Sequence, residues 1–147
     1  MIDSLSNLLV RDIGKIQDEL KSYGDERLIW KTTDGISNSA GNLALHVAGN
    51  LQHFIGAVLG DSGYVRQREF EFSAKDIPVT YLVSELDNAK KVVFTVFGKL
   101  SLDDFSKSYP INVFGEEMTT EWFLLHLLSH TNYHLGQINY HRRMTSY

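Results

Sequence analysis

Histidines at helical spacing are the residues of this chain best suited to chemistry. His126, His130 and His134 follow one another at four-residue steps. Such a step in an α-helix returns a side chain to nearly the same face one turn further on, so two imidazoles can bind one metal ion. His46 and His53, seven residues apart, form a second helical pair that could supply a third ligand. The spacing therefore favours a metal site shared between two helices.

Helical phase alone leaves several assignments open. His126, His130, His134 and His141 all fall in one narrow sector of the last predicted helix. His126 could be an alternative ligand, a residue that supports the ligands, or simply a packed side chain. His53 and His141 are more typical of surface or partner-contacting residues, because an isolated helical histidine is more often packed or exposed than a ligand.

Three histidine ligands would leave a coordination position open, which is typical of catalytic rather than structural zinc sites. A metal ion in such a site lowers the pKa of a bound water or thiol and supplies a nucleophile at neutral pH. The chain has no cysteine, which excludes disulfides, thiolate ligands and a cysteine nucleophile. Any thiol chemistry must therefore use a thiol from outside the protein.

Other polar residues are weaker candidates. Asn50 follows His46 by one helical turn and could line the same pocket, or it could bond to a buried backbone group. The segment Arg66–Phe72 could be a substrate-binding patch, but alternating charge in a loop is more often a solvated ion-pair cluster. No general base or other catalytic side chain can be assigned, and the histidine motif lacks the glutamate of His-Glu-x-x-His hydrolases.

Apolar residues recur at three- and four-residue steps in four segments, as expected of amphipathic helices. Asp3 or Ser4 is expected to cap the first helix, Ser39 to cap the second, and Gly60 to end the second. The predicted helices span residues 3–23, 40–59, 78–100 and 119–144.

Long connections separate these segments, and residues 111–118 are expected to form a short hairpin around Gly115. No strand pattern elsewhere has comparable strength. The sequence therefore predicts an all-α fold, an up-down four-helix bundle with long connections after helices 1, 2 and 3. The fourth helix is apolar on almost every side, which is typical of a central helix or one that contacts a partner subunit.

Composition limits the class of protein. A chain of 147 residues, 43% of them hydrophobic and 22% charged, fits one globular domain over residues 1–147. The net charge of −4 argues against a broad nucleic-acid-binding surface, which needs clustered lysine and arginine. No apolar run reaches the roughly 18–20 residues needed to cross a bilayer, and the first residues do not resemble a secretory signal. We therefore expect a cytoplasmic protein.

Two segments resemble the DinB-like (DinB/YfiT) superfamily of four-helix-bundle metalloenzymes, and the similarity extends over essentially the whole chain. They are the stretch from Leu45 to His53 and the stretch from His126 to Ile138, with the Val65–Phe72 run between them. The resemblance implies that one histidine of the second helix and a His-x-x-x-His pair of the last helix bind a divalent metal ion. Carried over by motif, the ligands are His46, His130 and His134.

The resemblance also implies a reaction. Characterised relatives transfer low-molecular-weight thiols to electrophiles, or catalyse a thiol-dependent isomerisation, and many are dimers. We therefore expect a zinc- or nickel-dependent S-transferase or isomerase that uses an exogenous thiol, acts on a small molecule and forms a homodimer. The alternatives are a metal-dependent hydrolase and a non-catalytic, stress-related metal-binding bundle.

Overall fold

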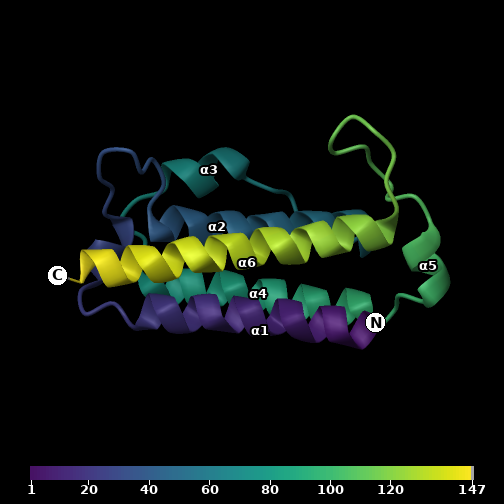
Figure 1. Cartoon of the computed structure of the whole chain (residues 1–147), viewed down its shortest axis with the longest axis horizontal. Helices are drawn as coiled ribbons and strands as arrows, with labels where there is room; N and C mark the ends of the chain where they lie inside the picture. The colour runs from purple at the N-terminus through teal and green to yellow at the C-terminus, as the bar shows by residue number, and fades with distance from the viewer. Residues whose placement is uncertain (147) are drawn as a thin grey trace.

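Four long helices lie side by side along one axis in the computed structural model, which describes residues 1–146 (Figure 1). Shorter helices lie in the connections, and residues 1–146 contain no strand. The long helices are α1 (Ile2–Lys21), α2 (Ala40–Leu51) with its π-helical continuation η2 (Gln52–Leu59), α4 (Val79–Phe97) and α6 (Thr120–Thr145). The short helices are η1 (Glu26–Trp30), α3 (Arg68–Ser73) and α5 (Leu102–Ser106). The predicted all-α bundle and its long connections are confirmed.

The ends of α2 and its continuation follow the predicted signals. The Ser39 side chain accepts a hydrogen bond from the Asn42 backbone N–H, and the continuation of α2 ends at Gly60. The predicted cap of the first helix is wrong, because α1 begins at Ile2 and no side chain caps it. Its first-turn backbone groups are exposed at the chain end, where water can satisfy them.

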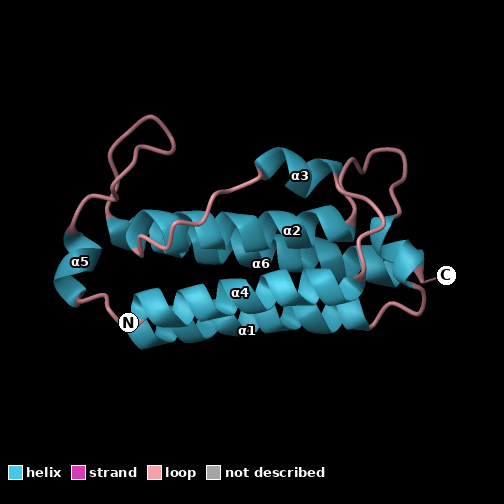
Figure 2. Cartoon of the chain, turned by 180° about the vertical axis from the view of Figure 1, so that it is seen from behind, coloured by secondary structure: helices cyan, strands magenta, loops and turns pink. Residues whose placement is uncertain are grey.

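Two connections differ from what the sequence predicted. The charged run after the second long helix forms α3, which packs on α2 (Figure 2). The hairpin predicted over 111–118 is wrong. The only bridge there joins Ser108 to Thr119, just outside the predicted range, and it closes a loop in which Gly115 has a positive φ of 81°.

The helix directions depart from a strict up-and-down order. Gln52 contacts Glu85, and further along both helices a Cβ added to Gly60 would meet Val96. Residue numbers therefore rise in the same direction in α2 and α4. The connection 60–78, which carries α3, runs back along the length of the bundle to make this possible (Figure 1).

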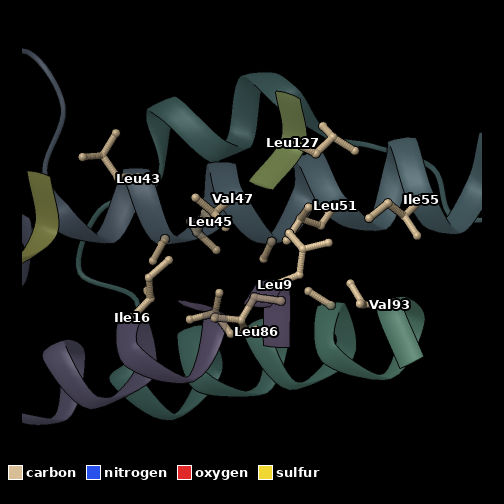
Figure 3. Close-up of a cluster of buried hydrophobic side chains, with 14 of the residues drawn as sticks. Leu9, Ile16, Leu43, Leu45, Val47, Leu51, Ile55, Leu86, Val93 and Leu127 are labelled. Carbon is tan, nitrogen blue, oxygen red and sulfur yellow. The ribbon is translucent and has the colours of Figure 1, made fainter. Parts of the chain in front are cut away.

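The core fills the space between α2 on one side and α1 and α4 on the other (Figure 3). Its side chains are almost fully buried and are mostly leucine, isoleucine and valine, which recur at helical spacing. Examples in Figure 3 are Leu9, Ile16, Val47, Leu51, Ile55, Leu86 and Val93. This packing fixes the face that α2 presents to α6.

Polar contacts fix the rotation of α6 against α1. Asp12, only 1% exposed, accepts a hydrogen bond from Asn132 at 3.1 Å. Two turns further on, Glu19 accepts from Asn139 at 2.8 Å and pairs with Arg142. Because these residues lie on the opposite face of α6 from His130, the contacts direct the histidine face toward α2. Over residues 1–146, no helix is long and apolar enough to cross a membrane.

Candidate metal centre

Three histidine nitrogens converge where α2 and α6 face each other. His130 Nε2 lies 3.1 Å from His46 Nε2 and 3.1 Å from His134 Nε2. One ring nitrogen from each residue lies within 4.8 Å of the other two. The structure thus brings together the three residues that the sequence motif selected, and it brings neither His53 nor His126 into the group.

This spacing fits a metal ion. Four nitrogens arranged tetrahedrally about 2.05 Å from zinc lie about 3.3 Å from one another, close to the two distances of 3.1 Å. Hydrogen bonds among the three histidines explain this grouping less well than a metal ion does. Glu71 Oε1 and Gln137 Oε1 are acceptors, so the Nδ1 atoms of His46 and His134 must each carry a proton and donate it. Both Nε2 atoms are then lone pairs without a proton. His130 Nε2 has at most one proton to share between them.

A buried carboxylate orients His46 from behind. Glu71 Oε1 lies 3.1 Å from His46 Nδ1, and the Glu71 side chain is 5% exposed. Arg66 forms a bidentate pair with the same carboxylate, with both nitrogen–oxygen distances 3.0 Å. A carboxylate that accepts the Nδ1 proton fixes the histidine tautomer that leaves Nε2 free for a metal. Glu71 therefore supports a ligand, and it does not itself face the other two histidines.

The interpretation of Arg66–Phe72 as a solvated ion-pair cluster is wrong for two of its residues. Glu71 turns inward because the short helix α3 lies against α2. Arg66, two residues before α3, pairs with Glu71 and so also lies beside His46. Sequence reasoning missed this role because an alternating charge pattern does not show which side of a loop becomes buried. Arg68 and Glu69 are exposed, as that interpretation predicted.

Gly49 makes room for Glu71. A Cβ atom added at Gly49 would lie 2.0 Å from Glu71 Oε2 and 2.7 Å from its carboxyl carbon. Any larger residue at this position would therefore displace the carboxylate. The glycine three residues after His46 was the one signal in the sequence that another group approaches the helix closely at this point.

The other two candidate ligands, His130 and His134, are held differently. His134 Nδ1 lies 2.7 Å from Gln137 Oε1, one turn along the same helix. The Nδ1 atom of His130 is buried and has no hydrogen-bond partner among the described residues, and the same holds for Asn50 Oδ1. Asn50 is 7% exposed, so the structure places this residue in the interior between helices, with a polar atom left unmatched.

His126 lies in an aromatic cluster next to the three histidines. Its ring stacks on Trp122, with centroids 5.6 Å apart and planes 2° from parallel, and Phe114 contacts it edge-on at 5.0 Å. The His126 and His130 ring centroids are 6.2 Å apart. The packed role left open for His126 is thus the one the structure shows, with the ring forming a wall beside His130.

The remaining histidines stand apart from the group. The π-helical turns that begin at Gln52 break the α-helical periodicity on which the pairing of His46 with His53 rested. His141, expected at the surface or against a partner, is half-buried and makes two hydrogen bonds within the chain. Its Nδ1 accepts a hydrogen bond from the Tyr23 hydroxyl at 2.6 Å, and its Nε2 donates to the Lys31 carbonyl at 2.8 Å.

The site keeps His130 and His134 neutral and the Glu71 carboxylate charged. Burial, together with the neighbouring histidines and Arg66, lowers the pKa of His130 to about 3. Burial also lowers the pKa of His134, and the hydrogen bond to Gln137 only partly opposes it. For Glu71, burial acts to raise the pKa, but the bonds from His46 and Arg66 outweigh burial and lower it. Neutral imidazole is the form that binds metal.

A cleft of about 590 Å³ opens beside His134, one of the candidate ligands, and this volume suits a small organic molecule. His134 and Gln137 line it, together with other residues of α6 and of the 31–38 loop. Its apolar walls come from Ile36, Leu43, Tyr133, Tyr140 and Met144. His134 is the one candidate ligand that lines this cleft, so it links the histidine group to a space in which a substrate could bind.

Comparison with known proteins identifies the family of this chain but no activity. A search of curated proteins found no match. The family described as "Protein of unknown function (DUF1572)" matches residues 3–146, which include every element of the candidate metal centre. With nearly the whole chain matched, the protein belongs to the DUF1572 family.

Proposed function

We propose that the protein is a metal-dependent enzyme of the thiol-dependent transferase or isomerase type. The observation that carries this proposal is the convergence of three histidine nitrogens, from His46, His130 and His134, beside a ligand-sized cleft. We propose further that the DUF1572 family is a branch of the DinB-like superfamily. The motif positions, the four-helix bundle and the grouping of these three residues all support that placement.

The chain's own residues prepare the site. Glu71 holds the His46 ring and its tautomer, and Gln137 does the same for His134. Burial keeps His130 neutral throughout the physiological range. A bound zinc or nickel ion would lower the pKa of a thiol or water beside it and so supply a nucleophile at neutral pH.

The position of the carboxylate favours thiol chemistry over hydrolysis. A metal-dependent hydrolase usually needs a carboxylate near the open coordination position to activate water. In residues 1–146, no carboxylate oxygen joins the group of three histidine nitrogens within 4.8 Å. Glu71 contacts His46 Nδ1 instead, on the side away from the other ligands, and Arg66 already neutralises its charge.

Metal binding and activity can be tested in turn. Purified protein, free of any metal-affinity tag, is titrated with zinc and with nickel by competition against a chromophoric chelator. We expect about one ion per chain, with loss of binding in His130→Ala and retention in His53→Ala, which keeps all three ligands. The same variants are then assayed for consumption of a small thiol such as cysteine in the presence of 1-chloro-2,4-dinitrobenzene.

In that reaction the thiol sulfur forms a bond to the aromatic carbon, chloride leaves, and the thiol proton passes to solvent. We expect turnover that chelator abolishes and that His130→Ala loses. Turnover equal in His130→Ala and wild type would rule out the metal-dependent mechanism. Metal binding without turnover of any thiol and electrophile pair would support a non-catalytic bundle instead.

We also propose a homodimer, as the resemblance implies. Trp122 and Leu125, which are 52% and 47% exposed, place large apolar side chains on the outer surface at the start of α6. Such side chains are typical of interface residues. Sedimentation equilibrium of the wild type and of Trp122→Ala tests this proposal, since a monomeric wild type would contradict it. The cytoplasmic location stays a prediction.

A further inference from the structure

The cleft beside the metal ligands has an unusual charge pattern for an acidic protein. Lys31 is the only aspartate, glutamate, lysine or arginine among the residues that line it in the described part of the chain. The net charge of the whole chain is −4. Asp34 belongs to the same loop but does not line the cleft. The space therefore carries a local positive charge that no acidic residue in its wall cancels.

The Lys31 ammonium is available to a ligand. Its side chain is exposed, and it forms no ion pair within residues 1–146. The backbone at this position is fixed, because the Lys31 carbonyl accepts the hydrogen bond from His141, whose other nitrogen is bonded to Tyr23. The ammonium group is thus attached to a rigid corner of the cleft, where η1 ends.

The apolar wall of the cleft is incompletely covered. Tyr133, Tyr140 and Met144 are between 64% and 67% exposed, and Ile36 across the cleft is 43% exposed. Contiguous exposed side chains of this kind mark ligand-binding grooves. Flat aromatic and sulfur-containing side chains pack well against the faces of an aromatic ligand.

We infer that the cleft binds an amphipathic organic anion, a molecule with an aromatic or alkyl body and a carboxylate group. Its body lies against Tyr133, Tyr140 and Met144, its carboxylate pairs with Lys31, and its other end lies beside His134. This inference deepens the proposed function, on which it rests for the reacting end of the molecule. Lys31 is then a specificity-determining residue, and it selects anionic over neutral substrates.

A matched pair of probes tests the inference. The probes are 2-naphthoate and its neutral isostere 2-naphthamide, and their dissociation constants are measured by two-dimensional amide NMR titration. The proteins are wild type, Lys31→Met, Tyr140→Ala and the control Lys91→Met, an exposed lysine on α4 outside the cleft. Each protein is measured with added zinc and after treatment with chelator. Shifts should centre on the backbone amides of residues 31–38 and of Gln137.

We expect wild type and Lys91→Met to bind naphthoate about fivefold more tightly than naphthamide, the preference that one exposed ion pair provides. Lys31→Met should lose this preference, whereas Tyr140→Ala should weaken the binding of both probes alike. Equal affinity of wild type for the two probes, or a preference that survives in Lys31→Met, would overturn the inference. A preference that disappears with chelator but is the same in wild type and Lys31→Met would also overturn the inference, because the carboxylate would then bind the metal.

The outcome separates this inference from the proposed function. If wild type binds no zinc but keeps its Lys31-dependent preference in chelator, the metal-dependent function fails and the anion cleft stands. If zinc binds and the preference is absent, the cleft assignment fails alone. If Tyr140→Ala converts a dimer to a monomer, a second copy of the chain covers the cleft and the inference is overturned.

Discussion

The contact between Gly49 and Glu71 makes a prediction that two alanine substitutions can test. Gly49 and Gly136 are both helical glycines within one turn of a candidate ligand, His46 and His134 respectively. An added Cβ at Gly49 would lie 2.0 Å from Glu71 Oε2, whereas at Gly136 nothing lies within 4 Å. The same chemical change should therefore have opposite effects at the two positions.

The magnitudes follow from these surroundings. Replacing a helical glycine by alanine stabilises a helix by up to about 1 kcal/mol. At Gly136 this gain should appear almost in full. At Gly49 the carboxylate must move by more than 1 Å, which breaks its bonds to His46 and Arg66, and disrupting such a buried charge pair costs about 3–5 kcal/mol. The net loss in Gly49→Ala should be about 2–4 kcal/mol.

Two measurements check the prediction. Urea unfolding in the presence of chelator gives the free energy of unfolding of each metal-free variant, and competition with a chromophoric chelator gives the zinc affinity. Loss of the carboxylate behind a histidine ligand typically lowers metal affinity 10–100-fold, so we expect that range for Gly49→Ala and no change for Gly136→Ala. If Gly49→Ala matched Gly136→Ala in both stability and zinc affinity, Glu71 would not hold His46 as described.

Three further predictions follow from the same contacts. Glu71→Gln should lower the zinc affinity about tenfold or more and reduce the melting temperature, because it leaves the Arg66 charge, 12% exposed, without its carboxylate; an unchanged zinc affinity would contradict the orienting role. The metal-free protein should lose stability as the pH falls from about 6.5 toward 3. The pKa of His130 is about 3 in the folded protein and has its ordinary value in the unfolded chain, so the unfolded chain binds one more proton in this range. The contribution of His130 to this loss is at most about 1.4 kcal/mol per pH unit. His130→Gln should flatten this part of the profile in pH-dependent urea unfolding, and a slope equal to that of wild type would disprove the assignment. Tyr23→Phe should cost about 1 kcal/mol in thermal unfolding, because the His141 Nδ1 loses its 2.6 Å hydrogen bond, and a variant as stable as wild type would show that this bond contributes nothing.

The long helices were predictable because their signals are local. Apolar spacing located the four segments, and Ser39 and Gly60 marked both ends of the second. The direction of α4 was not predictable in the same way, because it depends on a crossover whose path is set by packing. The short helix α3 has few apolar residues in sequence to reveal it, and it is stabilised by its contacts with α2 rather than by its own periodicity.

The candidate site was predictable only where residues share a helix. The phase of α6 placed His126, His130 and His134 on one face, but phase could not choose among them, and the family motif made that choice. The Glu71 contact joins residues 25 positions apart through a charged pair that the sequence pattern assigned to solvent. Gly49 was the local clue, since a glycine inside a helical pattern either weakens the helix or makes room for another group.

The electrostatics of the candidate metal centre connect the three histidines to the cleft. Histidine ligands are uncharged when they bind a metal, and the Arg66–Glu71 pair adds no net charge, so the protein would leave the charge of a bound divalent cation uncompensated. Burial among low-dielectric side chains makes that charge more effective than it would be in water. A group that completed the coordination would therefore be driven toward its anionic form, and the proposed anionic substrate would be attracted rather than repelled. Lys31 extends the same positive potential to the far end of the cleft, where it has no acidic neighbour in the wall.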